Sequence, residues 1–182
     1  MVVSAAEIRL PEWLAALPLP AAPASDAACM RFAVNAAREN VARGTGGPFG
    51  AVIRADSTGE IVSVGVNAVP LTGNPVLHAE TVAISLAADK LAGGGALTLF
   101  TSCEPCIMCL GALHWSGIQR IVSAALKADA EAVGFSEGAG TRELRAEMAA
   151  RGVAFEDGLL REEGAEVLRA FVASGKAIYG PT

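Results

Sequence analysis

The chain has 182 residues, 52% of them hydrophobic, so it is long enough and apolar enough to bury a full core. Its formal net charge is −5, with 14 basic residues against 19 acidic ones and no basic run. A protein that grips tRNA or DNA neutralises phosphates with clustered Lys and Arg, so this charge favours a small-molecule partner over a nucleic acid. No uncharged apolar stretch is long enough to span a bilayer, and we expect no membrane association.

The cysteine pattern indicates the compartment. Three of the four cysteines, Cys103, Cys106 and Cys109, are clustered, and Cys29 stands far from them. A secreted disulfide framework does not look like this, whereas metal binding in a reducing compartment explains the cluster. We therefore predict a cytoplasmic protein.

The N-terminal residues are rich in Ala and Pro and are predicted to form an irregular arm over residues 1–24. Glu7, Arg9 and Glu12 interrupt its apolar residues and no basic segment leads it, which is unlike a secretory signal peptide. Residues 25–182 are expected to form a single domain, because the sequence contains no internal repeat and no change in composition that would mark a second domain.

A helix and a β-hairpin come next. The predicted elements are a helix capped by Ser25 or Asp26 that runs to about Arg43, strands at 51–55 and 61–66, and a loop at 67–75. Gly44 ends the helix, and the turn residues Ser57, Thr58 and Gly59 make the strand pair an antiparallel hairpin.

Helices and strands alternate in the rest of the chain. The predicted elements are helices at 79–91, 105–115, 143–150 and 162–173, and strands at 96–101, 118–124 and 153–155. Strand-helix-strand spacing implies parallel pairing with right-handed crossovers, so the fold class is α/β. The helices that begin near residues 79 and 105 then start at one edge of the sheet, where α/β folds bind their ligands.

Two short motifs at these helix starts suit a metal. Cys106 and Cys109 are three residues apart, so on a helix whose first residue is Pro105 both sulfurs leave the same face. A helix N-terminus favours the thiolate, which is the form that binds metal. With the imidazole of His78 they make three protein ligands for a tetrahedral zinc ion, and the fourth position stays open for water.

Glu80 indicates what the open position is for. Residues i and i+2 lie on opposite sides of a regular helix, so His78 and Glu80 serve one site only if His78 precedes the helix with non-helical dihedrals. The carboxylate then lies beside the bound water and can carry its proton. His-x-Glu with Pro-Cys-x-x-Cys is the signature of zinc deaminases.

Three other interpretations of the cysteines stay open at this point. Cys103 has the same spacing again, so a closed structural site of three cysteines and His78 is conceivable. An iron–sulfur run would require a further Cys followed by Pro, which is absent. A dithiol redox motif would leave His78 and Glu80 unexplained.

The sequence resembles the cytidine deaminase-like zinc enzymes, and among these it is most similar to bacterial guanine deaminases. The matching stretches are Gly46-Gly47-Pro48-Phe49-Gly50-Ala51-Val52-Ile53, Gly65-Val66-Asn67, Leu77-His78-Ala79-Glu80, residues 101–112, Trp115-Ser116-Gly117, residues 130–135 and Glu137-Gly138. The resemblance implies a three-layer α/β fold with a central mixed five-stranded sheet flanked by helices, a zinc cofactor and a homodimer.

Residue roles follow from the resemblance. It makes His78, Cys106 and Cys109 the zinc ligands, Glu80 and Glu137 the catalytic carboxylates, and Asn67, Phe49, Ala79, Trp115 and Tyr179 the substrate-binding residues. Asn67 also suits a plain turn, and Trp115 plain core packing. Cys103 is a non-ligand in the family. The resemblance at Tyr179 implies a C-terminal tail that is exchanged between subunits.

The implied reaction is zinc-dependent deamination of guanine to xanthine and ammonia. Amino-triazines such as ammeline share the reacting edge of guanine and are further expected substrates. A tRNA-specific adenosine deaminase is the alternative, since those enzymes share the core motifs, and a structural zinc or thiol-binding module is the alternative outside enzymes. The long arm departs from shorter family members and is expected to cover either the pocket or the dimer surface.

Overall fold

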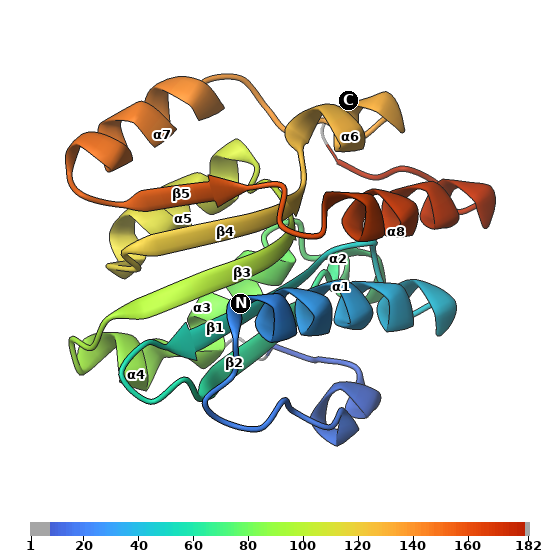
Figure 1. Cartoon of the computed structure of the whole chain (residues 1–182). Coiled ribbons are helices and arrows are strands. Elements are labelled where there is room, and N and C mark those ends of the chain that lie inside the picture. The colour runs from blue at the N-terminus through green and yellow to red at the C-terminus, as the bar shows by residue number, and fades with distance from the viewer. Residues whose placement is uncertain (1–7, 181–182) are drawn as a thin grey trace, which may run out of the picture.

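A five-stranded mixed sheet lies at the centre of the computed structural model, which describes residues 8–180 (Figure 1). Its strands are β1 (Gly50–Ala55), β2 (Ile61–Val66), β3 (Leu97–Cys103), β4 (Arg120–Ala125) and β5 (Ala154–Asp157), in the order β2-β1-β3-β4-β5. β1 runs antiparallel to both β2 and β3, whereas β3, β4 and β5 are parallel. The predicted α/β class, the hairpin and the parallel pairings are confirmed.

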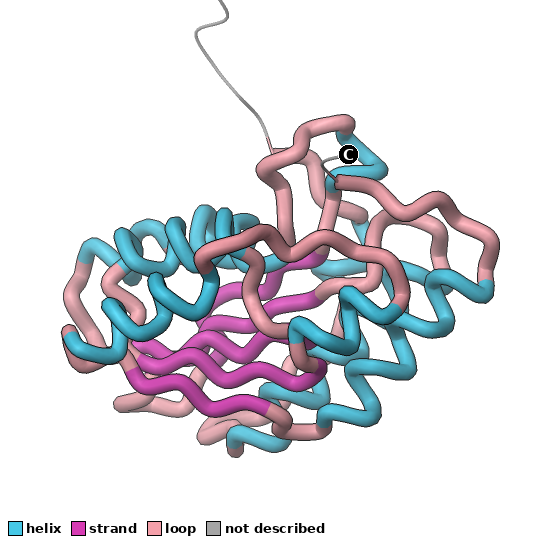
Figure 2. Tube along the Cα trace, turned by 90° about the horizontal axis from the view of Figure 1, so that it is seen from above, coloured by secondary structure: helices cyan, strands magenta, loops and turns pink. Residues whose placement is uncertain are grey.

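Helices cover both faces of the sheet and make three layers (Figure 1 and Figure 2). The helices are α1 (Asp26–Ala42), α2 (Val69–Thr72), α3 (Ala79–Leu86), α4 (Ala88–Ala92), α5 (Ile107–Ser116), α6 (Lys127–Ala132), α7 (Thr141–Ala150), α8 (Arg161–Ala173) and the 3-10 helix η1 (Glu12–Ala16). α1 and α8 pack on one face, and α3 and α5 pack on the other.

The central strand β3 is apolar enough to be buried on both faces of the sheet. All seven residues of β3 are buried, which is typical of a strand with helices on both sides. Phe100 packs in the cluster under α1 and α8, and its neighbour Leu99 packs in the cluster under α3 and α5. None of the described helices is long and apolar enough to cross a membrane.

Several element boundaries differ from the prediction. The helix expected from residue 79 to 91 is broken at Ala87, whose dihedrals (φ −90°, ψ 4°) leave the helical region, and it continues as α4. Alanine is a strong helix former, so the local sequence contains no signal for this break. The loop at 67–75 contains the single turn α2. Helix α6 was not predicted, although Asp129 marks its start by accepting a hydrogen bond from the Leu126 N–H at 2.8 Å.

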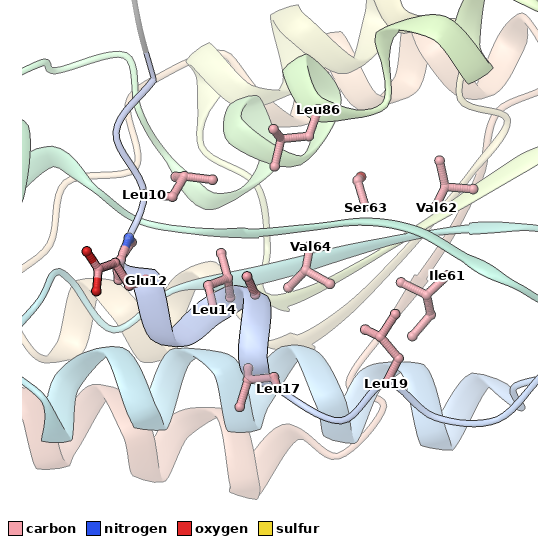
Figure 3. Close-up of a pocket in the computed structure, with 12 residues that line it drawn as sticks. Leu10, Glu12, Leu14, Leu17, Leu19, Ile61, Val62, Ser63, Val64 and Leu86 are labelled. Carbon is pink, nitrogen blue, oxygen red and sulfur yellow. The ribbon is translucent and has the colours of Figure 1, made fainter.

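The N-terminal arm is more ordered than expected over its described part, residues 8–24. It contains η1, and its apolar side chains face those of the edge strand β2 across a groove of about 430 Å³ (Figure 3). Ile8 and Leu10 pack on a small buried cluster of Ala68, Leu77 and Val82. The division of the chain into an arm and a single deaminase domain at residue 24 stays a prediction.

Candidate active site

The sheet order places the two metal motifs side by side. β2 and β3 are both antiparallel to β1, so their carboxyl ends meet at the same edge of the sheet. The connections after them lead to the starts of α3 and α5. His78 is the N-cap of α3 with extended dihedrals (φ −71°, ψ 161°), as predicted, and Cys106 is the N-cap of α5 (φ −66°, ψ 171°). Pro105 therefore precedes the helix, and its predicted place as the first helical residue is wrong.

His78, Cys106 and Cys109 form a group suited to a metal ion. Their donor atoms all lie within 4.8 Å of one another, with Nδ1 of His78 3.5 Å from Cys106 Sγ and 3.6 Å from Cys109 Sγ. Ligands at about 2.1 Å (N) and about 2.3 Å (S) from zinc, at tetrahedral angles, lie about 3.6 Å apart. The spacing of these three side chains therefore fits a zinc ion.

Cys103 does not join this group. Its thiol donates a weak hydrogen bond to the Leu126 carbonyl at 3.7 Å, and its side chain packs in the core under α1 and α8. Burial raises the pKa of Cys103, which disfavours the thiolate that a metal would need. Among the described residues the donor set thus has three members, as a catalytic zinc site requires.

The two ligand thiols differ in their protonation. The hydrogen bond from the Cys109 thiol lowers the pKa of Cys106 to about 4, and His78 adds to this effect. The same hydrogen bond raises the pKa of Cys109. The lowered pKa of Cys106 favours its thiolate, which is the form that binds a cation.

Glu80 is held beside the group rather than within it. Its side chain is buried, Oε1 accepts a hydrogen bond from Thr101 Oγ1 at 3.0 Å, and Oε2 accepts one from Cys109 Sγ at 3.3 Å. Burial, followed by the charge of Cys106, raises the pKa of Glu80 above its ordinary value. A carboxyl group with a raised pKa next to a metal site is suited to accepting and returning a proton.

Glu137 supplies a second buried carboxyl group. It lies on the loop between α6 and α7, and its carbonyl accepts a hydrogen bond from the Ile107 N–H at 3.1 Å, which ties the loop to the start of α5. Burial, followed by the charges of Cys106 and Glu80, raises the pKa of Glu137 to about 8. The predicted pair of carboxyl groups is thus brought to one place.

An aromatic wall completes the pocket. Phe135 lies 5.0 Å from Phe49 and 5.5 Å from Tyr179 between ring centroids, with both contacts edge-to-face. All three line an inner cavity of about 50 Å³, which shares His78, Glu137 and other walls with an outer cavity of about 490 Å³. Phe135 was not among the predicted site residues, and its position two residues before Glu137 was the available signal.

Two polar atoms near the pocket lack partners. Nδ2 of Asn67 and Oη of Tyr179 are buried and find no hydrogen-bond partner among the described residues. Asn67 Oδ1 accepts from the Val69 N–H at 3.2 Å, so this residue does form the turn that was considered for it, and its amide group stays available. A buried donor without a partner is costly, which favours a ligand there. Tyr179 lies in the pocket of its own chain.

Two predicted substrate contacts are not brought to the pocket of this chain. The Trp115 side chain is 86% exposed at the end of α5, so it belongs neither to the pocket nor to the core. Ala79 is fully buried, and its methyl group packs between α3 and the sheet. His78 and Glu80, on either side of Ala79 in sequence, line the pocket, whereas the side chain of Ala79 points away from it.

Comparisons with known proteins agree with this geometry. Guanine deaminase of Bacillus subtilis is 44% identical over 111 residues, which cover 59% of this chain and 69% of that protein. The solved guanine deaminase of Nitrosomonas europaea is similar over 95% of this chain and 99% of its own, at 36% identity and a TM-score of 0.86. Another solved structure, in complex with 2,6-diaminopurine, is similar over 96% of both chains, at 36% identity and a TM-score of 0.84. Relatives at lower identity include tRNA-specific adenosine deaminases.

The family assignment follows from the match to a family model. Residues 23–125 match the family described as the cytidine and deoxycytidylate deaminase zinc-binding region. This segment is more than half of the chain and contains both ligand motifs together with Glu80. The predicted zinc cofactor and the cytidine deaminase-like fold are therefore confirmed, and the chain belongs to the cytidine and deoxycytidylate deaminase zinc-binding family.

Proposed function

We propose that this chain catalyses the hydrolytic deamination of guanine to xanthine and ammonia. The observation that carries the proposal is the convergence of two buried carboxyl groups, Glu80 and Glu137, on a pocket next to a three-ligand zinc site. One carboxylate is enough to move protons, so the second is available to recognise the base. The similarity to guanine deaminases of two bacteria supports this choice.

Each pocket residue has a role in binding. Guanine presents N–H donors along the edge that carries its amino group. With a cation at the three-ligand site to favour its ionised form, Glu137 would accept such donors with strong bonds. The unpartnered amide of Asn67 donates to an acceptor atom of the ring. Phe49 and Phe135 supply apolar surface for the flat base.

Proton transfer falls to Glu80. His78, Cys106 and Cys109 would hold a zinc ion, whose positive charge would lower the pKa of a water molecule and favour ionised carboxylates nearby. The Glu80 carboxylate would accept one proton from water and deliver it to the ring nitrogen beside the reacting carbon as the water oxygen bonds to that carbon. It would then take the remaining proton from that oxygen and pass it to the amine, and the C–N bond would break as the C=O bond forms. In sum, one water molecule is consumed, its oxygen replaces the amino group, and ammonia leaves.

The residues of the pocket determine which base is the preferred substrate. Adenine offers a ring acceptor where guanine offers N1–H, so Glu137 facing adenine would be desolvated and poorly paired. Such a mismatch costs about 1 to 3 kcal/mol, which is about a 5- to 150-fold preference. An acidic chain without a basic run also disfavours tRNA as a substrate.

Ammonia release across a substrate panel tests the proposal. The panel contains guanine, adenine, cytosine, guanosine, ammeline and tRNA, and we expect guanine well above the others. Glu137→Ala is expected to lose guanine turnover and keep its zinc, whereas Glu166→Ala on the exposed face of α8 should match the wild type. Inosine formation in tRNA at a rate equal to or above guanine turnover would overturn the choice in favour of a tRNA adenosine deaminase.

A further inference from the structure

A run of hydrogen bonds links the N-terminal arm to the pocket. The Trp13 indole donates to Thr45 Oγ1 at 3.0 Å, and the Thr45 hydroxyl donates to Asn40 Oδ1 at 2.8 Å. The Asn40 amide then donates to the carbonyls of Gly47 and Asn67, both at 2.9 Å. Asn40, at the end of α1, therefore joins the segment before β1 to the segment after β2.

Asn40 is saturated by these contacts. Its side chain is fully buried, and both of its N–H donors and its acceptor oxygen are used, so one orientation of the amide satisfies all of them. Gly46 is required by this close approach, since a Cβ there would lie 2.0 Å from the Asn67 oxygen and 2.5 Å from Asn40 Nδ2. The absence of a side chain at Gly46 therefore allows Asn40 and the Asn67 carbonyl to approach closely enough for this hydrogen bond.

Both carbonyls that Asn40 holds belong to segments that contact residues of the pocket wall. The Asn67 N–H donates to the carbonyl of Phe49 at 3.0 Å, and Phe49 lines the inner cavity, while Nδ2 of Asn67 stays without a partner. A Cβ at Gly47 would lie 1.5 Å from Oη of Tyr179, so the Gly47 backbone forms the surface on which that ring rests. A shift of Asn40 would therefore move the backbone segments that contact Phe49 and Tyr179, while the zinc ligands at the starts of α3 and α5 stay in place.

Further contacts hold the N-terminal arm beside the end of α1 and the loop before α3. The Arg43 guanidinium lies over the Trp13 ring, 5.5 Å from its centroid. Ile8 and Leu10 pack on Leu77, which directly precedes the ligand His78. In Figure 3 the side chains of Leu10, Leu14 and Leu17 spread along the arm beside β2. The arm thus lies against the loop that connects β2 to the site.

We propose that Asn40 is a positioning residue for the substrate pocket and that the arm, through Trp13 and Thr45, holds Asn40 in place. The inference rests on the proposed function, since it takes Asn67 and the Tyr179 side of the pocket as the walls that meet the base. These walls contact atoms of the base that do not react. Such contacts are equally strong before and during the reaction, so disturbing them raises KM more than it lowers kcat.

The test removes single hydrogen-bonding groups from the connection between Trp13, Thr45 and Asn40. Thr45→Val deletes the hydroxyl at constant shape, and Trp13→Phe deletes the indole N–H while keeping an aromatic ring under Arg43. We expect Thr45→Val to raise KM for guanine about three- to tenfold with kcat changed by less than about twofold, and Thr45→Ser to restore wild-type KM. Trp13→Phe should shift KM in the same direction. The double variant should be no worse than Thr45→Val, because the indole then has no acceptor to lose.

Matched controls separate positioning from plain stability. Thr98→Val deletes a hydroxyl that bonds Asp56 at 2.8 and 3.0 Å, at the opposite end of β3 from the site. It should lower the melting temperature about as much as Thr45→Val but leave KM unchanged, and all variants should keep one zinc per chain. Wild-type KM in both Thr45→Val and Trp13→Phe, with only a lower melting temperature, would overturn the proposal.

Failure of the proposed function would look different. The wild type is first assayed on the full panel, and KM of the variants is measured for whichever base it turns over. An error in the guanine assignment then appears in the wild type, whereas an error in the role of Asn40 appears only in the variants. Asn40→Ala is the strongest variant, and we expect it to exceed Thr45→Val in its effect on KM if it folds.

Discussion

At the scale of single residues, function depends on where each ionisable group lies relative to the metal ligands. Glu80 Oε2 accepts a hydrogen bond from Cys109 Sγ, yet Cys109 belongs to the group suited to a metal ion and Glu80 does not. The distinction comes from the start of α3, where extended dihedrals at His78 let residues two apart face one site. Two variants test these roles separately.

The first prediction concerns Glu80. Glu80→Gln should lower kcat by at least about 100-fold, because an amide cannot accept the proton. Zinc content, measured by mass spectrometry of the metal, should stay at one per chain, since the three ligands are untouched. Loss of zinc in this variant would show that Glu80 is itself a ligand.

The second prediction contrasts two cysteines that share the same spacing. Cys106→Ala should lose zinc and activity, because it removes one of three ligands. Cys103→Ala should keep both and lose about 1 kcal/mol of stability, as expected for a small buried side chain. Metal content and urea unfolding check this contrast. A lower zinc content in Cys103→Ala would instead support a closed structural site in which three cysteines and a histidine bind the zinc.

At the scale of elements, the glycine run before β1 decides how closely the segments around the pocket approach. Gly46→Ala should destabilise the protein and weaken substrate binding, because its Cβ would overlap the Asn67 carbonyl oxygen, which is backbone and cannot move aside cheaply. Gly95→Ala is the control, since a Cβ there meets nothing within 4 Å. Thermal unfolding and KM are the measurements. Equal melting temperatures for the two variants would contradict the steric argument.

At the scale of the whole molecule, an ion-pair network ties α1 to three strands. The Asp26 carboxylate accepts hydrogen bonds from Arg54 and Arg120, both at 2.6 Å, and Arg120 also binds Glu156 of β5. The hydrogen bond from Arg120 lowers the pKa of Asp26 below its ordinary value of 3.8. This network joins residues that are up to 130 positions apart, so it stabilises the fold rather than any one element.

Acid should weaken this contribution. Because the folded pKa of Asp26 is depressed, its stabilisation is present in full above the unfolded pKa and is lost as the pH falls through the folded pKa. Asp26→Asn should therefore be less stable than the wild type at pH 7, and the gap should shrink below about pH 4. Urea unfolding at a series of pH values measures the gap. The exposed Glu166→Gln is the control, and a gap for Asp26→Asn that stays constant into strong acid would contradict the linkage.

Assembly is the remaining prediction at this scale. The family resemblance implies a homodimer, and exposed apolar side chains such as Leu71, Val76 and Leu86 are compatible with one. Sedimentation velocity at micromolar concentration should give a species of twice the chain mass. If only a monomer is observed, the prediction of a homodimer is wrong, and so is the prediction that Tyr179 is exchanged between subunits. Within the single chain, Tyr179 lines the inner cavity.

The sequence by itself predicted the His-Cys-Cys group, the position of Glu80 beside it and the α/β class, because these depend on spacing along the chain. Two cysteines three residues apart and a histidine before a helix converge wherever the helices start side by side. Only the tertiary structure decided the rest. It excluded Cys103 from the metal group, turned Trp115 outward, broke the helix at Ala87 and joined the arm to the pocket through Asn40. Each of these depends on contacts between residues far apart in sequence, and local spacing carries no information about such contacts.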